Sequence, residues 1–254
     1  MSGKSSREQR QAERLQAEST ATAGERRTRL MQLAAGAAFL AVAAVLALIV
    51  VNSSSNDSGG DTELEGVAAV GRLLAGIPQQ GMTLGDPKAK VELAEFGDLQ
   101  CPVCAAYSEE VLPEVMETQV RKGAVKIDFR NLTIIGPESV AAGAAALAAG
   151  EQGRGWSFVD LFYRNQGDEN SGYADDGAFL RALAKAAGVP NLAKWDAERA
   201  ELTAEVEETS QEAANLGFDG TPSFAIKGPK TGGIKLLGFP ESAGELEDAI
   251  EEAG

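Results

Sequence analysis

The stretch Cys101-Pro102-Val103-Cys104 decides the fold of this chain, and it contains the only two cysteines among 254 residues. It follows a strand-like run, VELAEF at 91–96, and precedes a helix-like run at 105–121. A Cys-x-x-Cys pair at a strand-to-helix turn is typical of a redox dithiol. At a helix N-terminus, unpaired N–H groups and the helix dipole favour a thiolate, which is the attacking species in thiol–disulfide exchange.

Three other interpretations of the cysteine pair compete with this one. Two structural cysteines could fall this close together by chance, and that alternative stays open. A zinc site needs about four ligands, mostly Cys and His. Because the chain has no histidine and no third cysteine, we expect no metal site. A purely structural disulfide is disfavoured, since closing so short a loop adds little stability.

Residues 33–51, LAAGAAFLAVAAVLALIVV, form a run of 19 residues without a charge. As a helix this run would span roughly 28 Å, close to the ~30 Å apolar core of a bilayer. Basic residues precede it and acidic residues follow it, so the positive-inside rule predicts a cytoplasmic segment at 1–32 and an exported remainder. A cleaved signal peptide is the alternative, but its apolar region would be shorter, about 7–15 residues. We therefore expect a single-pass anchor in the cell membrane.

The charge of the chain fits an exported acidic domain. The net charge is −15, and residues 1–51 carry +3 from seven basic and four acidic residues, which leaves −18 for the rest. Nucleic acid is excluded as an expected partner, because phosphate binding needs a basic surface. An exported location also suits a dithiol, since that compartment permits disulfides and the cytosol keeps thiols reduced.

The chain after the apolar run divides into a linker at 52–80 and one domain at 81–254. The linker begins with the flexible NSSSNDSGGD and contains a short predicted helix at 65–77. In the domain, the pattern predicts an α/β fold with a mixed sheet, interrupted by a helical insertion at about 136–216. The predicted strands are 91–96, 125–132, 223–227 and 234–237, and the predicted helices are 105–121 with a kink at Pro113, 139–150, 156–165, 176–187, 192–216 and 242–253.

A second motif, Gly220-Thr221-Pro222-Ser223-Phe224, stands at the start of a predicted strand. A proline entering a strand is unusual, because it removes a hydrogen-bond donor from the ladder. Alone this motif is weak, and X-Pro bonds are cis in only about 5–6% of folded cases. Paired with an upstream Cys-x-x-Cys turn, it is much more specific.

With both motifs, the chain resembles the thioredoxin superfamily, and most of all the membrane-anchored DsbA-type thiol–disulfide oxidoreductases. The matching segments are EFGDLQCPVC at 95–104, VLPE at 111–114, GTPSF at 220–224 and the lead-in LGDP at 84–87. The resemblance covers roughly 81–253. It implies a thioredoxin fold, a mixed sheet with flanking helices, carrying the helical insertion that plain thioredoxin lacks.

The resemblance also implies roles for the matched residues. Cys101 would be the exposed nucleophile that forms a mixed disulfide, and Cys104 would resolve it. Pro222 would be cis and pack beside the two sulfurs, where it shapes a groove for an extended substrate backbone. Thr221 would offer main-chain hydrogen bonds to that substrate, and Pro102 and Val103 would complete the substrate-binding residues.

Glu95 is the candidate proton carrier. It alternates with Val91 and Leu93 on the strand below the motif. The resemblance implies a buried carboxylate here that moves protons to and from the inner cysteine. Burial would raise its pKa and suit it to acid–base work. The alternative is an ordinary solvated Glu on an edge strand. Asp98, in the turn, is expected to be exposed.

The sequence departs from the best-known DsbA pattern at Val103, where that pattern has His beside the Pro. A cationic His would stabilise the thiolate and make the disulfide more oxidising. Each pKa unit is worth about 1.4 kcal/mol, or about 30 mV for a two-electron couple. We therefore expect a Cys101 pKa below that of free Cys but less depressed than in the His-containing enzymes, and a milder oxidant.

The sequence thus predicts a membrane-tethered, extracytoplasmic enzyme that forms disulfides in folding exported proteins. The resemblance implies re-oxidation by a quinone-linked membrane oxidase of the DsbB or VKOR kind. We expect a monomer with no bound cofactor other than the Cys101–Cys104 disulfide itself. Two alternatives remain. One is a reductase or isomerase with the same site, and the other is a thioredoxin-fold peptide-binding or chaperone module without redox chemistry.

Overall fold

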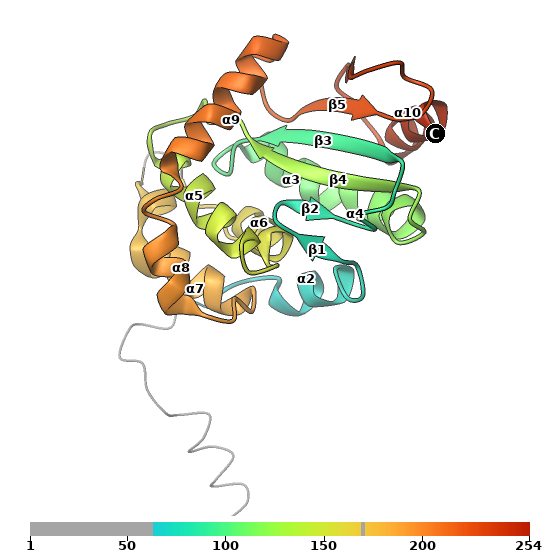
Figure 1. Cartoon of the computed structure of the whole chain (residues 1–254). Coiled ribbons are helices and arrows are strands. Elements are labelled where there is room, and N and C mark those ends of the chain that lie inside the picture. The colour runs from blue at the N-terminus through green and yellow to red at the C-terminus, as the bar shows by residue number, and fades with distance from the viewer. Residues whose placement is uncertain (1–62, 169–170) are drawn as a thin grey trace, which may run out of the picture. The chain divides into compact units, whose positions relative to one another are not determined.

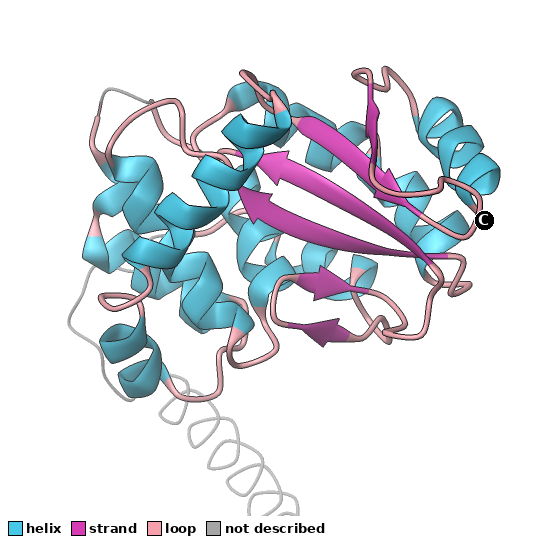
Figure 2. Cartoon of the chain, turned by 45° about the horizontal axis from the view of Figure 1, so that its top comes forward, coloured by secondary structure: helices cyan, strands magenta, loops and turns pink. Residues whose placement is uncertain are grey.

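A six-stranded mixed sheet organises the part of the chain that the computed structural model describes, residues 63–168 and 171–254. The strand order is β1-β2-β4-β3-β5-β6 (Figures 1 and 2). The strands are β1 Gln79–Gln80, β2 Thr83–Leu84, β3 Val91–Gly97, β4 Val125–Asn131, β5 Ser223–Lys227 and β6 Lys235–Leu237. The β3–β4 pair is parallel and the other pairs are antiparallel. The predicted α/β class with a mixed sheet is confirmed.

The helices lie on both faces of this sheet. In chain order they are α2 Val67–Leu73, α3 Pro102–Glu110, α4 Leu112–Val115, the π-helical turn Met116–Val120, α5 Glu138–Gly150, α6 Gly155–Arg164, the 3₁₀ turn Tyr173–Asp175, α7 Gly177–Ala186, α8 Leu192–Glu198, α9 Thr203–Leu216 and α10 Ala243–Ala253. In Figure 1, α3 and α4 lie behind the sheet and α9 lies in front of it. The segment between β4 and β5 holds α5 to α9, where we expected a helical insertion.

The register of β3 separates the two faces. Glu95 on β3 is level with Phe129 of β4 and Phe224 of β5, so these three side chains share one face. That face packs against α3, α6 and α10 in the larger apolar core. The opposite face carries Ala94 and Phe96, which pack with Ala213 of α9 in a smaller core. Because helices cover both faces, β3 is buried along almost its whole length.

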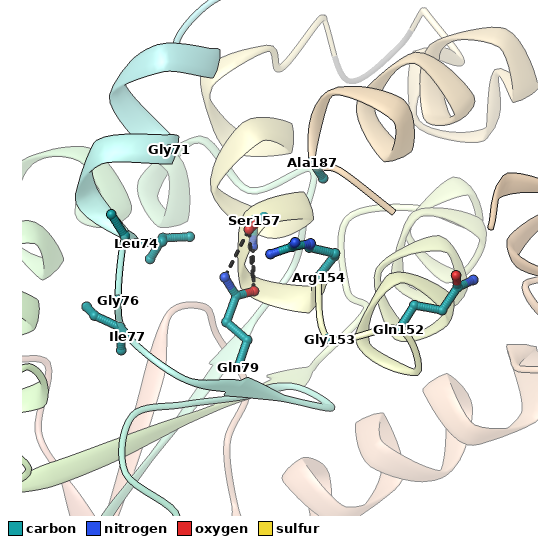
Figure 3. Close-up of a pocket in the computed structure, with 11 residues that line it drawn as sticks. Gly71, Leu74, Gly76, Ile77, Gln79, Gln152, Gly153, Arg154, Ser157 and Ala187 are labelled. Atoms are coloured by element: carbon teal, nitrogen blue, oxygen red, sulfur yellow. Dashed lines mark hydrogen bonds between the residues drawn. The ribbon is translucent and has the colours of Figure 1, made fainter. Parts of the chain in front are cut away.

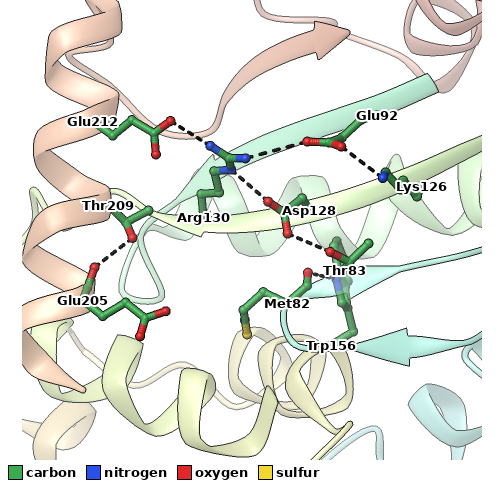
Figure 4. Close-up of polar contacts among 10 residues, drawn as sticks. All are labelled: Met82, Thr83, Glu92, Lys126, Asp128, Arg130, Trp156, Glu205, Thr209 and Glu212. Carbon is green, nitrogen blue, oxygen red and sulfur yellow. Dashed lines mark hydrogen bonds and ion pairs between the residues drawn. The ribbon is translucent and has the colours of Figure 1, made fainter. Parts of the chain in front are cut away.

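An ion-pair network stands on the α9 face (Figure 4). The Arg130 guanidinium contacts Asp128 at 2.9 Å, Glu212 of α9 at 2.9 Å and Glu92 of β3 at 3.7 Å. It also lies 5.7 Å from the centre of the Phe96 ring. Half-buried charges are held at little net cost when they are paired in this way, so the network joins α9 to the sheet.

Two helix predictions need correction or refinement. The single helix predicted at 192–216 is wrong: α8 ends at Glu198 and α9 begins at Thr203, with Leu202 packed against the core between them. This turn lets α8 stay against α5 and α7 while α9 reaches the sheet. The helix predicted at 105–121 is interrupted after Glu110, next to Pro113, as the kink prediction requires.

The segment before Gly81 is folded where the structure describes it. The short helix expected at 65–77 is present as α2, and Val70, Leu74 and Ile77 are buried in the larger core. The folded unit therefore starts before residue 81, because these apolar side chains cover α6. Within residues 63–168 and 171–254, every helix is too short or too polar to cross a bilayer. The anchor expected at 33–51 lies outside these residues.

Candidate redox site

The Cys-x-x-Cys turn places its two sulfurs in different surroundings. Cys101 is the N-cap of α3, with extended backbone angles, and Pro102 fills the first helical position, which needs no N–H donor. The Cys104 backbone N–H donates to Cys101 Sγ at 3.4 Å. Both cysteines are free thiols in this structure; Cys101 is 4% exposed and Cys104 is fully buried. The expectation that Cys101 is exposed is therefore wrong, because the chain around Thr221, whose carbonyl oxygen lies 3.5 Å from Cys101 Sγ, packs against it. Pro102 and Val103 are exposed beside them.

The pKa values of the two thiols are shifted in opposite directions. The Cys104 thiol donates a hydrogen bond to the Cys101 sulfur, and with the backbone N–H groups of residues 103 and 104 this lowers the pKa of Cys101 to about 6 against the opposing effect of desolvation. Burial, and then the neighbouring Cys101, raises the pKa of Cys104 well above its ordinary value. At neutral pH Cys101 is therefore the thiolate and Cys104 the thiol. The expected lowering at Cys101 is confirmed.

The loop before β5 closes the other side of the turn. The Thr221–Pro222 bond is cis, as the resemblance implied, and Pro222 is buried. The Cys101 sulfur lies 3.5 Å from the Thr221 carbonyl oxygen, to which it donates when it is protonated. Within the described part of the chain, the Thr221 hydroxyl oxygen is buried without an ordinary hydrogen-bond partner, and it lowers the pKa of both thiols. Thr221 and Pro222 therefore meet the dithiol directly.

Aromatic packing fixes the approach of this loop. Phe218, two residues after the end of α9, lies with its ring 5.1 Å from that of Phe96 on β3. The Ser223 hydroxyl donates to the Gly220 carbonyl at 2.6 Å, which closes the turn around Pro222. The contact of Phe218 with Phe96 of β3 thus fixes where the helical insertion ends and the loop to Pro222 begins.

Glu95 is buried on the face of β3 that α3 covers: it is level with Phe224, whose ring lies 5.0 Å from that of Tyr107 of α3. The Glu95 side chain is 1% exposed, and neither carboxylate oxygen has a hydrogen-bond partner among the described residues. Burial raises the pKa of Glu95 to about 8, and the charge of Asp160 contributes to the rise. The alternative of a solvated Glu on an edge strand is wrong, because β3 lies between β4 and β5.

The expectation that Asp98 is exposed is also wrong. Its side chain is fully buried, and one oxygen accepts from the Gln100 N–H at 2.9 Å. The other accepts from the N–H groups of Ile134 and Ile135 at 2.8 and 2.9 Å. The Asp98 carbonyl in turn accepts from the Cys101 N–H at 3.0 Å. Asp98 therefore ties the loop after β4 to the redox turn.

Sequence reasoning missed two further residues that hold the turn, both near the end of α6. Gln166 donates to the carbonyls of Leu99 at 2.6 Å and Cys101 at 3.1 Å. The Tyr163 hydroxyl donates to the Asp98 carbonyl at 3.4 Å. The short Asx turn from Asp98 to Gln100 has a local sequence signal. The contacts from α6 have none, because they join positions more than sixty residues apart.

A pocket of about 550 Å³ lies away from this site (Figure 3). It is lined by α2, by the turn after α5 and by the first residues of α6, including Arg154 and Ser157. The Ser157 backbone and hydroxyl are hydrogen-bonded to Gln79 across it. Tyr163, which contacts the redox turn, stands near the other end of α6. The pocket is thus separate from the dithiol.

Known proteins share this fold and this stretch of sequence. A family model described as Thioredoxin matches residues 78–251. A relative from Bacillus anthracis named probable disulfide bond formation protein D is 30% identical over 152 residues, covering 58% of this chain and 69% of that protein. The protein of that name from Bacillus cereus is 29% identical over 150 residues, with the same coverage. The crystal structure of oxidised BdbD from Bacillus subtilis matches with a TM-score of 0.60 at 22% identity, covering 70% of this chain and 97% of that one.

Proposed function

The chain belongs to the thioredoxin family and is a DsbA-like thiol–disulfide oxidoreductase, and we propose that its Cys101–Cys104 pair forms disulfides in exported proteins outside the cell membrane. The observation that carries the proposal is the asymmetry of the two thiols. Cys101 lies at a helix N-terminus with its thiolate stabilised, whereas Cys104 is fully buried and protonated. A pair of this kind has one attacking and one resolving sulfur.

In the proposed reaction the enzyme starts with the disulfide formed. A substrate thiolate attacks Cys101 Sγ, the bond to Cys104 breaks, and Cys104 leaves as a thiolate that takes a proton from Glu95. A second substrate thiolate then attacks the substrate sulfur of the mixed disulfide. The substrate disulfide forms, Cys101 leaves as a thiolate, and the two electrons remain on the enzyme dithiol. The low pKa of Cys101 makes it a good leaving group.

The substrate groove of this proposal contains the cis-Pro loop and the exposed part of the turn. Thr221 and Pro222 meet Cys101 on one side, while Pro102 and Val103 are exposed on the other. Val103 is 51% exposed, and Ile134 and Ile135, which Asp98 ties to the turn, are also exposed apolar residues. This surface suits the apolar segments of unfolded chains, which folding proteins expose.

The stabilised Cys101 thiolate supports the oxidising direction of electron flow. Any interaction that favours the Cys101 thiolate favours the dithiol over the disulfide, and so makes the disulfide a stronger oxidant. With Val103 in place of a cation and a Cys101 pKa of about 6, the pair is a milder oxidant than the His-containing enzymes. In this proposal the cysteine pair is the redox-active group, and the reaction needs no bound metal or organic cofactor.

The location and partner extend the proposal beyond the described residues. The uncharged run at 33–51 supports a tether that holds the catalytic domain, as a monomer, on the outer side of the cell membrane. The chain has no second cysteine pair to pass electrons onward. Turnover therefore needs an external oxidant, and a quinone-linked membrane oxidase of the DsbB or VKOR kind fits a tethered donor.

The reduction potential of the pair tests the proposal. The full-length protein is equilibrated with glutathione buffers, and the fraction oxidised is read after acid quenching and thiol labelling. A potential well above the value of about −270 mV for thioredoxin, toward about −120 mV, supports an oxidant. A value near that of thioredoxin favours the reductase alternative. A pair that never equilibrates, with a Cys101→Ser variant that keeps its biological function, favours a binding module.

A further inference from the structure

A second buried acid lies on the same side of the sheet as the dithiol. Asp160, on α6, is 1% exposed, as is Glu95 on β3. Asp160 Oδ1 accepts from Arg164 Nε at 3.1 Å. Asp160 Oδ2 and both Glu95 oxygens make no hydrogen bond of ordinary geometry among the described residues. Two carboxyl groups buried on one side of the sheet need an explanation, because each is costly there unless it is protonated or paired.

Only one of the two acids has a counter-charge. Arg164 pairs with Asp160 and also contacts Glu109 of α3, an exposed carboxylate, at 3.3 Å. Glu95 has no such ion pair within residues 63–168 and 171–254. Tyr107 of α3 and Tyr163 of α6 face Glu95, and Tyr163 also interacts with Cys104. The groups that face Asp160 are Ser108 and Glu109 of α3 and Arg164 of α6. Beyond Tyr107 lies Glu245 of α10.

We propose that Asp160 is a positioning residue for the proton of Glu95: the buried pair carries one negative charge, on Asp160, and one proton, on Glu95, which is the proton exchanged with Cys104. The inference deepens the proposed function and rests on it. Asp160 acts without contact to either sulfur. It acts through its charge, which keeps the proton on Glu95 until the leaving Cys104 thiolate takes it.

The proton affinities agree with this geometry. Desolvation raises the pKa of Asp160 to about 6, and the charge of Glu109 adds to the rise. The charge and hydrogen bond of Arg164 and the hydrogen bond of the Ser108 hydroxyl oppose it. Glu95 lacks such help, and burial together with the Asp160 charge raises its pKa to about 8. Asp160 therefore ionises first, and its charge disfavours ionisation of Glu95.

The step in which Cys104 attacks the mixed disulfide reports on the proton that Cys104 exchanges with Glu95. When reduced protein meets oxidised glutathione, Cys101 first forms a mixed disulfide and one glutathione thiolate leaves. Cys104 then gives its proton to the Glu95 carboxylate and attacks Cys101 Sγ. The Cys101–Cys104 bond forms, the bond to glutathione breaks, and a second glutathione thiolate leaves. This second step needs Glu95 ionised, so its rate rises with pH through the Glu95 midpoint near 8.

The test is Asp160→Asn in the full-length chain, with the second step followed by acid quenching and mass spectrometry across pH. Removing the charge lowers the midpoint on the order of one pH unit, so that glutathione release at pH 7 becomes several-fold faster than in the wild type. Glu95→Gln abolishes the midpoint. The matched control is Asp128→Asn, which also removes an Arg-paired carboxylate, at 2.9 Å from Arg130, but on the opposite face of the sheet (Figure 4). Its midpoint stays at the wild-type value.

An unchanged midpoint in folded Asp160→Asn, or slower release at the same midpoint, overturns the inference and assigns Asp160 a purely structural role. If that variant does not fold, carbon NMR of the wild type decides. The Glu95 and Asp160 carboxyl signals must each show an inflection at the midpoint of the other, and independent titrations refute the pair. Failure of the proposed function gives a different result, because the wild-type protein then forms no mixed disulfide with glutathione. The NMR titration still shows whether Glu95 and Asp160 titrate as a coupled pair.

Discussion

The Cys101 sulfur and the Thr221 carbonyl oxygen lie 3.5 Å apart although 120 positions separate them in the sequence. This contact joins the start of α3 to the loop before β5. It places the Cys101 sulfur against the backbone of the cis-Pro loop. The Thr221 hydroxyl lies in the same site and acts on both sulfurs. Thr221 therefore contacts the dithiol through two groups, its carbonyl and its hydroxyl, and in the proposed function it would influence both substrate binding and the redox balance.

Replacing Thr221 with Val tests this dual influence. The Thr221 hydroxyl lowers the pKa of Cys101, so its loss raises that pKa from about 6 by up to about one unit. The disulfide then becomes less oxidising, by about 30 mV for each unit. Thiolate absorbance against pH and glutathione equilibration measure the two shifts. Thr221→Ser keeps the hydroxyl and is expected to match the wild type; an unshifted potential in Thr221→Val contradicts the role.

Replacing Cys104 with Ala tests the origin of the Cys101 thiolate. The thiol of Cys104 is the largest influence that lowers the pKa of Cys101. In Cys104→Ala the pH midpoint for alkylation of Cys101 by iodoacetamide rises from about 6 toward the ordinary value of about 9. Cys104→Ser retains a hydrogen-bond donor and keeps a lower midpoint than the Ala variant. Equal midpoints in the two variants would show that the helix N-terminus alone stabilises the thiolate.

Replacing Glu95 with Gln tests the cost of the buried acid. The native pKa of about 8 exceeds the ordinary value of 4.5, so between these pH values the unfolded chain loses the proton and the native protein keeps it. Native stability therefore falls as pH rises through this window. Glu95→Gln removes that loss and is more stable than wild type at pH 8.5 by roughly 4–5 kcal/mol, with little difference at pH 4.

Urea unfolding of the reduced proteins at the two pH values measures this difference. Glu92→Gln is the control, because Glu92 lies on the same strand and pairs with Lys126 at 3.2 Å on the α9 face (Figure 4). It is expected to leave the difference between pH 4 and pH 8.5 unchanged. A Glu95→Gln variant whose stability falls with pH as steeply as that of the wild type would count against a buried, protonated Glu95.

Replacing Asp98 with Asn tests how the redox turn is held. The carboxylate accepts from three backbone N–H groups, and an amide leaves at least one of them facing an NH₂ group. The expected loss is about 1–3 kcal/mol in the free energy of unfolding, with faster hydrogen exchange at the N–H groups of Ile134 and Ile135. Asp219→Asn, in the exposed part of the loop before Pro222, is expected to change neither quantity.

Several of these relationships were visible in the sequence. The strands at 91–96, 125–132 and 223–227 were predicted within one or two residues of β3, β4 and β5, because each is a short apolar run bounded by turn residues. The position of Glu95 in one such run suggested a buried acid. The same reasoning failed at Asp98, since an Asp in a turn is ordinarily solvated and its three donors come from two separate segments.

Helix boundaries in the insertion show where local pattern is insufficient. The run at 192–216 has no Pro or Gly until Gly217, so local propensity predicts one helix. The chain instead turns between Glu198 and Thr203, because Trp195 is anchored in the core by a hydrogen bond to the Ala145 carbonyl at 2.9 Å and α9 must pack on the sheet. Tertiary packing overrides propensity here.

The sequence by itself determined the fold class, the dithiol at a helix N-terminus and the proline loop, because these depend on residue type and short spacing. Only the tertiary structure decided which groups surround the dithiol. Tyr163 and Gln166 come from a segment more than sixty positions away, and the packing of α6 brings them to the redox turn. The resemblance implied Thr221 beside the dithiol, and the structure supplies its contact with Cys101. Proton affinities depend on that three-dimensional burial and charge, and no local sequence pattern encodes them.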